Sequence, residues 1–378
     1  MQNNLGLYIH IPFCTQKCNY CAFVSYRSGA NTIKNYFDAL LKEVELASFE
    51  HKNKTVDTIY IGGGTPSYVK SGYIKDLLQK INEHFNVIKE CEITIECNPE
   101  STKEEKLQEY KKAGVNRLSV GLQSTNDKLL KLLNRAHNAK QFFETIKQAK
   151  EVGFTNISAD LILSLPTQKL RDVKRSLKKL SKLNLMHLSV YDLILEEETP
   201  FQKQIASGEL KPLNEKLSLK MQDYTTKYLQ KQGFTRYEVS AFCKEGFKSK
   251  HNLKYWNLDD YLGLGIAAHS KIGKERFANT SNLKTYLKNI ENNELIYENK
   301  VTLTKQDEKE EFIMLSLRKK EGIDLEQYKN LFNDDLTVQK EEIIKTLQQQ
   351  NLIKLENNHL FLTNNGFNVL NLVIEKLV

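Results

Sequence analysis

The stretch Ile11-Pro-Phe-Cys-Thr-Gln-Lys-Cys-Asn-Tyr-Cys21 carries three cysteines within eight residues. Cys14, Cys18 and Cys21 follow the spacing Cys-x3-Cys-x2-Cys. Three thiolates can hold three irons of a cubane 4Fe-4S cluster and leave the fourth iron open, whereas four-cysteine sites ligate every iron. A structural zinc site would need a fourth Cys or His, residues 22–25 contain neither, and a disulfide would leave one cysteine over. The spacing therefore predicts a cluster with one open iron.

The composition is that of a globular protein with more than one domain. The chain has 378 residues, 40% hydrophobic and 27% charged, which is enough for a large domain and a smaller one. No apolar run is long enough for a membrane span, and the N-terminus lacks the basic start and apolar run of a signal peptide. Oxygen-sensitive thiolate ligands also suit a reducing compartment. We therefore expect a cytoplasmic protein.

The net charge of +8 has two interpretations. It could attract an anionic partner such as nucleic acid, a phospholipid surface or a porphyrin with propionates. It could equally be the solvated surface of a lysine-rich chain. The lysines are spread along helical faces rather than clustered, which favours a solvated surface and leaves peripheral membrane association as the alternative.

Strand-like and helix-like segments alternate over the first 200 residues. Buried strands are expected at 5–11, 56–61, 91–97, 117–121, 157–163 and 188–193. This alternation requires a parallel sheet with helices outside it, and an open doubly wound sheet and a barrel both fit. Thr65, Glu96, Gln123 and Asp160 each lie at or just beyond the end of a strand, which is where barrels carry their chemistry. We therefore predict an α/β fold with a partial (β/α)6 barrel.

The pattern changes near residue 300. Three helical stretches precede two apolar segments joined by an Asn-Asn turn, which predicts a hairpin, and a last helix follows. This arrangement is typical of a winged-helix-like α+β domain. No basic cluster marks a recognition helix, so we expect a packing or docking role and no nucleic-acid partner. The predicted divisions are a barrel at 1–200, an extension at 201–299 and the C-terminal domain at 300–378.

Several motifs together resemble the radical S-adenosylmethionine (SAM) superfamily. Within it they resemble the oxygen-independent coproporphyrinogen III oxidase group, which has HemN-like and HemW-type members. The matching stretches are Tyr8-Ile-His-Ile-Pro-Phe-Cys14, Gly62-Gly-Gly-Thr-Pro66, Gly121-Leu-Gln-Ser124 and Asp160-Leu-Ile-Leu-Ser-Leu-Pro166. The resemblance continues into the C-terminal domain, and so covers nearly the whole chain.

The resemblance implies cofactors and site residues. SAM would chelate the open iron, and an electron from the cluster, supplied by an electron donor, would cleave SAM to a radical. The positions that the resemblance assigns to SAM are Tyr8, Tyr20, Gly63, Gly64, Thr65, Glu96, Gln123, Arg135 and Asp160. A carboxylate can bind ribose hydroxyls and an arginine can hold a carboxylate, which suits these residue types.

Two departures separate this chain from the oxidase. Phe23 stands where the oxidase has a further cysteine, and the cluster loop begins too early for the oxidase's N-terminal extension. Both are features of HemW-type proteins, which implies a haem chaperone that passes haem to acceptor haemoproteins. We expect coproporphyrinogen III dehydrogenase activity to be absent. That activity and a HemN-like radical SAM methyltransferase are the alternatives.

The motif His251-Asn-Leu-Lys-Tyr-Trp256 contains the only tryptophan of the chain. Taken alone, it could be a loop histidine beside two interfacial aromatic residues. The HemW-type resemblance implies instead that it binds haem. An imidazole can ligate haem iron, and Tyr255 and Trp256 offer flat apolar surface with polar edges. His251, Tyr255 and Trp256 are therefore the predicted haem residues.

Overall fold

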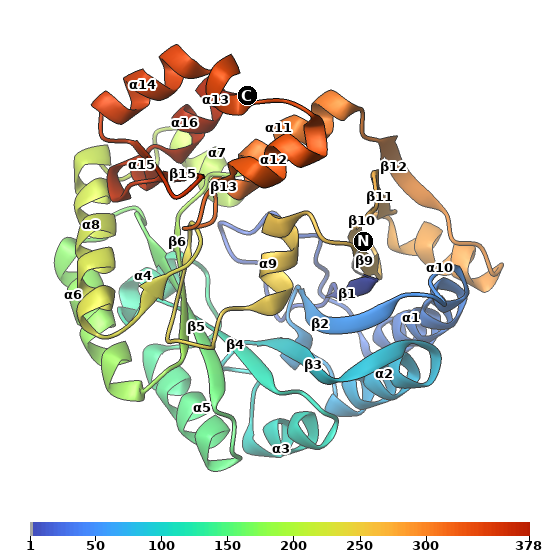
Figure 1. Ribbon diagram of the computed structural model, residues 1–378. Helices are drawn as coiled ribbons and strands as arrows, with labels where there is room; N and C mark the ends of the chain where they lie inside the picture. Colours follow the sequence, from blue (N-terminus) through green and yellow to red (C-terminus); the bar gives the residue numbers. More distant parts are fainter. Residues whose placement is uncertain (1–2) are drawn as a thin grey trace.

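The predicted six-stranded parallel sheet is confirmed in the computed structural model, which describes residues 3–378 (Figure 1). Its strands are β1 (Asn4–Ile11), β2 (Thr55–Gly63), β3 (Asn86–Cys97), β4 (Arg117–Gln123), β5 (Asn156–Leu163) and β6 (His187–Asp192). Each strand pairs in parallel with the next one along the chain. The carboxyl ends of all six strands therefore meet at one end of a partial barrel.

Helices surround this barrel. They are α1 (Ala30–Glu50), α2 (Ser71–His84), α3 (Glu104–Lys112), α4 (Asp127–Leu132), α5 (Ala139–Glu151) and α6 (Leu170–Leu180), with short 3-10 turns η1 (Pro66–Tyr68) and η2 (Ser181–Leu183). Strand β1 shows why they pack there. Leu5, Leu7 and Ile9 are fully buried in the same hydrophobic core as the helices, and side chains of a strand alternate between its two faces. The residues between them, including Tyr8, therefore face the barrel interior.

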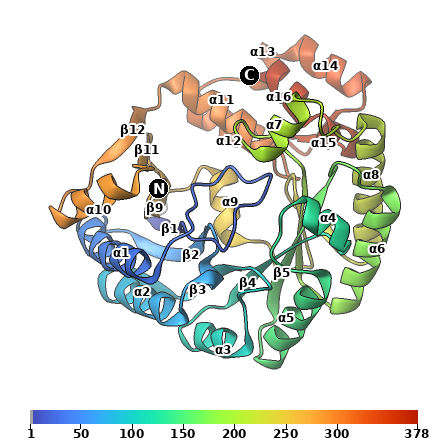
Figure 2. The same cartoon turned by 180° about the vertical axis from the view of Figure 1, so that it is seen from behind.

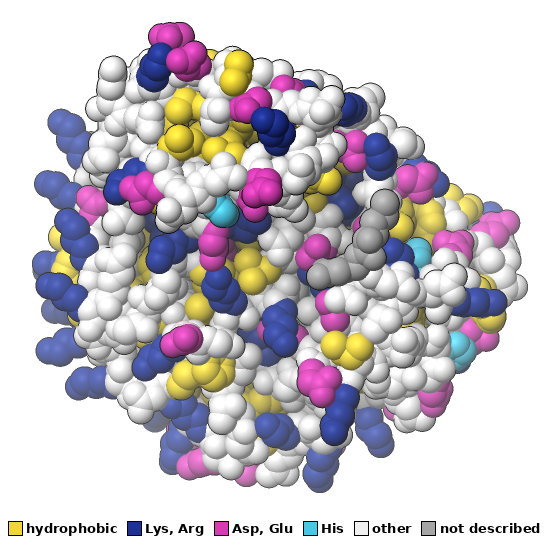
Figure 3. Space-filling view, in the orientation of Figure 1, with side chains coloured by type: hydrophobic (Ala, Val, Ile, Leu, Met, Phe, Trp, Pro, Cys, Tyr) yellow, Lys and Arg dark blue, Asp and Glu magenta, His cyan; other side chains and the backbone are white. Residues whose placement is uncertain are grey.

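The segment after β6 adds strands to both edges of the same sheet. At the β6 edge lie β8 (Ala241–Cys243) and β7 (Thr235–Arg236), and at the β1 edge lie β9 (Tyr261–Leu264), β10 (His269–Ile272), β11 (Glu275–Asn279) and β12 (Tyr297–Thr302). Its helices are α7 (Pro200–Ala206), α8 (Glu215–Lys231), α9 (Lys250–Asn257) and α10 (Leu283–Glu291). The result is one 12-stranded sheet. Lys and Arg side chains are dense on the flank where α6 and α8 lie (Figure 3).

The two ends of the barrel are covered differently. Helix α9 lies across the centre of the ring in Figure 1, and the loop between β1 and α1 crosses in front of it when seen from behind (Figure 2). Helix α9 hydrogen-bonds to Thr58 of β2 and to Glu92 of β3, which pair with each other well before the carboxyl ends of the strands. It therefore closes the amino end of the barrel. The β1–α1 loop, which carries the three cysteines, covers the carboxyl end.

The C-terminal domain has its own hydrophobic core. Its elements are α11 (Lys305–Ser316), β13 (Ile323–Asp324), α12 (Leu325–Phe332), α13 (Leu336–Gln339), α14 (Glu341–Gln349), β14 (Ile353–Glu356), β15 (His359–Leu362), α15 (Asn364–Asn368) and α16 (Leu370–Leu377). The predicted hairpin is β14–β15, and Asn357 and Asn358 both take positive φ, as a tight hairpin turn requires. Within residues 3–378, no helix combines the length and apolar character that a bilayer crossing needs.

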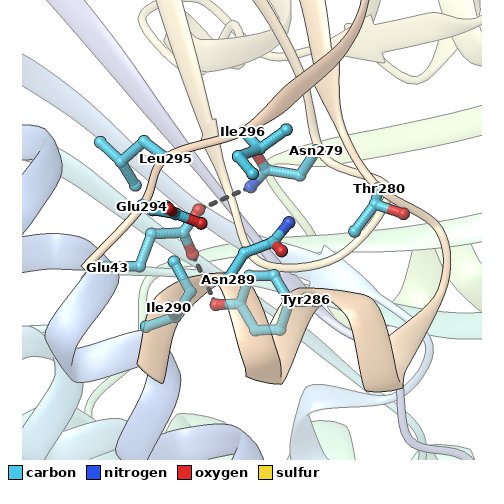
Figure 4. A pocket seen from close by; sticks show the side chains of 9 residues that line it. All are labelled: Glu43, Asn279, Thr280, Tyr286, Asn289, Ile290, Glu294, Leu295 and Ile296. Atoms are coloured by element: carbon cyan, nitrogen blue, oxygen red, sulfur yellow. Dashed lines mark hydrogen bonds between the residues drawn. The ribbon is translucent and has the colours of Figure 1, made fainter. Parts of the chain in front are cut away.

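One buried carboxylate joins the barrel to the added strands (Figure 4). Glu43 on α1 accepts hydrogen bonds from the Gly265 backbone N–H at 2.7 Å, from Asn279 Nδ2 at 2.6 Å and from the Tyr286 hydroxyl at 2.6 Å. Burial raises the pKa of Glu43 to about 7, although these hydrogen bonds oppose the shift. The folded protein therefore holds this carboxyl largely protonated below neutral pH.

We expect Glu43→Gln to change how stability depends on pH. The pKa of Glu43 is higher in the folded state than its ordinary value of 4.5, so protonation of this carboxyl favours folding at low pH. This contribution to the free energy of unfolding is lost as the pH rises through about 7, and the loss is at most about 3 kcal/mol. Glutamine cannot ionise, so the apparent Tm of the variant minus that of the wild type should increase from about pH 5 to about pH 8. Glu45→Gln on the same helix is the control, because Glu45 is only half-buried and Lys80 lowers its pKa. A Tm difference that stays constant with pH would contradict the assignment.

Candidate functional site

The three cysteines lie in one loop at the carboxyl end of the barrel (Figure 2). Cys14, Cys18 and Cys21 are all half-buried free thiols. The Cys14 N–H donates to the Tyr26 carbonyl at 3.1 Å, so the loop closes on itself after passing through all three cysteines. Burial raises the pKa of Cys14 and raises that of Cys21 to about 11. Iron binding would therefore release protons from these thiols.

The glycine-rich turn after β2 packs directly against this loop. The Gly64 N–H donates to the Ile11 carbonyl at 2.9 Å, and the Thr65 N–H donates to the Phe13 carbonyl at 2.8 Å. A Cβ atom on Gly64 would lie 2.8 Å from the Ile11 oxygen and 2.9 Å from the Phe13 nitrogen. Glycine is needed there because a side chain would push the two backbones apart.

Two side chains donate hydrogen bonds to cysteine sulfurs. Thr65 Oγ1 lies 3.4 Å from Cys14 Sγ, and Arg135 Nη1 lies 3.5 Å from Cys18 Sγ. The Arg135 guanidinium is also 3.5 Å from the Tyr20 hydroxyl. Donors and positive charge beside the sulfurs stabilise negatively charged thiolates and clusters.

The donor set fits a cubane cluster. Within the described part of the chain, no three His, Cys, Asp or Glu side chains converge on a single metal ion. A cubane spreads its three thiolates over three different irons, so it needs a loop of this kind rather than one convergent point. Cys14, Cys18 and Cys21 could therefore hold such a cluster, with Thr65 and Arg135 in contact with its ligands.

Other predicted SAM residues line the interior beneath the loop. Glu96 on β3 accepts a hydrogen bond from the Tyr60 hydroxyl at 2.8 Å and from the Gly63 N–H at 3.3 Å. Burial raises the pKa of Glu96 to about 7. The Tyr8 hydroxyl is 3.0 Å from His10 Nδ1. Tyr8 is thereby connected to the loop, because His10 Nε2 is 2.9 Å from the Val24 carbonyl.

Gln123 and Asp160 belong to the neighbouring strands β4 and β5. Gln123 Nε2 and Arg135 Nη2 both lie close to Gly121, since each would be 3.0 Å from a Cβ atom added there. Asp160 accepts a hydrogen bond from Ser119 Oγ at 3.3 Å, and burial raises its pKa. Asp160 lies in the middle of β5, not at its end as expected, and it bonds to β4, whereas Gln123 is the last residue of β4.

The predicted haem motif forms α9, at the opposite end of the barrel from the cysteines. His251 is fully buried and stacks on the Tyr60 ring at 5.3 Å between centroids. Its Nδ1 is 2.9 Å from Thr58 Oγ1 and its Nε2 is 2.9 Å from the Tyr255 hydroxyl. Burial lowers the pKa of His251 to about 3. The ring is therefore neutral, and both of its nitrogens are engaged.

The two aromatic residues of the motif face different surroundings. Tyr255 packs edge-on against Tyr261 with ring centroids 4.7 Å apart. Trp256 lies under the Arg318 guanidinium, 5.6 Å from the ring centroid, and its Nε1 has no hydrogen-bond partner within residues 3–378. The expectation of a loop histidine is wrong, because Ser249 caps a helix here and places His251 on its inner face.

Comparisons with known proteins decide the family. Residues 8–180 match the Radical SAM superfamily and residues 303–369 match the HemN C-terminal domain. The heme chaperone HemW of Lactococcus lactis subsp. lactis is 35% identical over 378 residues, which covers 100% of this chain and 98% of that protein. The chain belongs to the HemW family of radical SAM proteins. The heme chaperone HemW of Bacillus subtilis is also similar to this HemW-family chain, with 34% identity over 95% of each protein.

The solved structure of coproporphyrinogen III oxidase (HemN) from Escherichia coli, a radical SAM enzyme, has the same fold. Its TM-score is 0.86 over 100% of this chain and 90% of the enzyme. The sequence identity is 24%, so this likeness concerns the fold alone. It confirms the predicted fold class.

Sequence reasoning missed Asn98, which links the two sulfur donors of this HemW-family protein. Asn98 Nδ2 donates to Thr65 Oγ1 at 3.1 Å, and Arg135 Nη2 donates to Asn98 Oδ1. One amide therefore orients both groups that contact Cys14 and Cys18. The position of Asn98, directly after β3 and before Pro99, is the sequence feature that could have indicated a site residue.

We expect Asn98→Ala to lower the reduction potential of the reconstituted cluster. Hydrogen bonds to cluster sulfurs stabilise the more negative reduced state. Weakening one such bond by about 1 kcal/mol corresponds to a shift on the order of 50 mV for a one-electron couple. An EPR-monitored redox titration measures the shift.

Asn116→Ala is the matched control for that titration. Asn116 bonds to the Ile93 N–H and the Cys91 carbonyl near the start of the barrel strands, away from the cysteine loop. Equal potentials for all three proteins would exclude a positioning role for Asn98.

Proposed function

We propose that this protein binds a 4Fe-4S cluster and SAM, binds haem, and transfers haem to acceptor haemoproteins. The observation that carries the proposal is likeness along the full chain, barrel and C-terminal domain together, to relatives named heme chaperones. The geometry of the cysteine loop supports the cluster. We further propose a cytoplasmic setting with an external electron donor, as the reducible cluster requires.

SAM would supply a radical precursor when bound at the open iron. The residues proposed to hold it are those that line the space between the loop and the strand ends. Glu96 and Asp160 offer half-buried carboxyl groups, and Arg135 offers a half-buried cation beside Tyr20. Gly63 and Gly64 keep side chains out of the turn, so a ligand can approach its backbone.

The runner-up function is coproporphyrinogen III dehydrogenase, and a HemN-like methyltransferase is the third candidate. Phe23, two positions after Cys21, is 61% exposed and has no thiol. We propose that this difference removes the dehydrogenase activity. Anaerobic incubation of the reconstituted protein with SAM and coproporphyrinogen III should then yield no protoporphyrinogen IX. Turnover that depends on SAM and the cluster would make the dehydrogenase the preferred function.

We propose that haem binds at α9 through His251, with Tyr255 and Trp256 as contact surface. Haem iron needs a free imidazole nitrogen, and Nε2 is hydrogen-bonded to the Tyr255 hydroxyl. Haem binding therefore requires the Tyr255 hydroxyl to move away from His251. The Tyr255 hydroxyl therefore competes with the haem iron for His251 Nε2, and Tyr255 is also a proposed neighbour of the haem.

Two variants test the haem site. His251→Ala should lower haem loading and leave the cluster spectrum intact, because the two sites use different residues. Tyr255→Phe should tighten haem binding by up to about tenfold, since one competing hydrogen bond is removed. His359→Ala in the C-terminal hairpin is the control. If wild-type protein binds haem and His251→Ala matches its affinity and Soret position, His251 is not the ligand.

A further inference from the structure

The positive charge of the chain is concentrated on one helix. Residues 169–182, which include α6, contain seven basic residues and one acidic residue, a net charge of +6 against +8 for the whole chain. The expectation that the lysines are not clustered is therefore wrong for this segment. The basic ridge consists of the exposed residues of α6, all of them basic: Arg171, Lys174, Arg175, Lys178 and Lys179.

Helical periodicity produces this separation. Val173, Leu177 and Leu180 are buried against the barrel, and the ridge occupies the opposite face. Asp172, the one acidic residue, is also buried, where it accepts hydrogen bonds from the Lys169 N–H at 2.9 Å and from Asn126 Nδ2 at 3.1 Å. Within residues 3–378, none of the ion pairs involves a ridge residue. The ridge charge is thus left uncompensated by nearby acids.

The neighbouring helix α8 extends the basic surface. Lys220, Lys227 and Lys231 are exposed on α8. The two helices are in contact, because Lys174 Nζ lies 4.8 Å above the Tyr224 ring and Ser181 Oγ is 3.2 Å from the Tyr228 hydroxyl. Figure 3 shows Lys and Arg side chains projecting along this edge of the molecule.

We propose that the basic ridge docks the protein on an anionic phospholipid surface. Each Lys or Arg near such a surface contributes attraction, and the attraction is additive over a cluster. No exposed large hydrophobic side chain within the described residues lies on α6 or α8, so the ridge binds by charge, without inserting into the bilayer.

The position of the ridge leaves both proposed ligand sites open. Helix α6 lies on the outer rim of the ring in Figures 1 and 2, away from the central α9 and the cysteine loop. A membrane that binds α6 at the rim therefore covers neither end of the barrel. The inference does not depend on haem or SAM binding, so it can fail independently of the proposed function.

Cosedimentation of the full-length protein with lipid vesicles tests the proposal. Vesicles of phosphatidylcholine with phosphatidylglycerol should bind the protein at low salt, and vesicles of phosphatidylcholine alone should not. Added salt should release the protein, because exposed charges are screened. The triple variant Arg171→Gln, Arg175→Gln, Lys178→Gln should bind about 100-fold more weakly, because each lost charge weakens binding roughly fivefold.

The control is Lys75→Gln, Lys112→Gln, Lys288→Gln, which removes the same charge from α2, α3 and α10. These three lysines are exposed and take part in no ion pair within the described residues. The control should bind like the wild type. Equal weakening of both triple variants would overturn the ridge assignment. Wild-type protein that ignores anionic vesicles but binds duplex DNA through the ridge would replace the lipid with a nucleic-acid partner.

Discussion

Replacing Cys14, Cys18 and Cys21 with alanine is expected to abolish the iron–sulfur cluster. The wild type should hold about four irons per chain after anaerobic reconstitution, and the triple variant should hold almost none. The brown absorbance and the SAM-dependent change in the EPR signal of the reduced cluster should disappear together. The loss should be complete because the three remaining cysteines are buried within strands β3 and β8, away from the loop.

The other three cysteines provide the matched control. Cys91, Cys97 and Cys243 are buried, and burial raises the pKa of each thiol. Their replacement with alanine should preserve the iron content and the EPR signal. A triple variant of the loop cysteines that keeps a full cluster would overturn the assignment of the loop.

Gly63→Ala is expected to weaken SAM binding at least about fivefold, because a non-glycine residue in this conformation costs about 1–3 kcal/mol. Gly63 has φ of +106°, and an added Cβ would lie 2.4 Å from His10 Nδ1. Relief of that clash would move either the turn or His10, which bonds to the Val24 carbonyl in the cysteine loop. Titration of SAM against the EPR signal of the reduced cluster measures the loss.

Gly72→Ala is the control for this substitution. Gly72 lies in the first turn of α2, and an added Cβ there would meet nothing within 4 Å. This variant should bind SAM like the wild type. Wild-type SAM affinity in Gly63→Ala would show that the turn is not part of the SAM site.

The order of the six barrel strands could be predicted from the sequence because it depends on local patterns. Leu5, Leu7 and Ile9 alternate with residues of the other face, and helical segments separate the strands, which requires parallel pairing. The Asn357-Asn358 turn was equally visible, since asparagine tolerates the positive φ of a tight hairpin. The cysteine spacing and the resemblance to HemW-type proteins were likewise contained in short stretches.

The sequence by itself determined the parallel barrel, the C-terminal domain and the cysteine loop, because each follows from spacing within one segment. Tertiary structure decided that α9 closes the barrel and engages both nitrogens of His251. It also decided that Asn98 connects Thr65 to Arg135. Within residues 3–378, it leaves the basic ridge of α6 without an ion pair. These features depend on contacts between residues far apart in the chain, and the periodicity of a single segment does not specify which distant segment will pack against it.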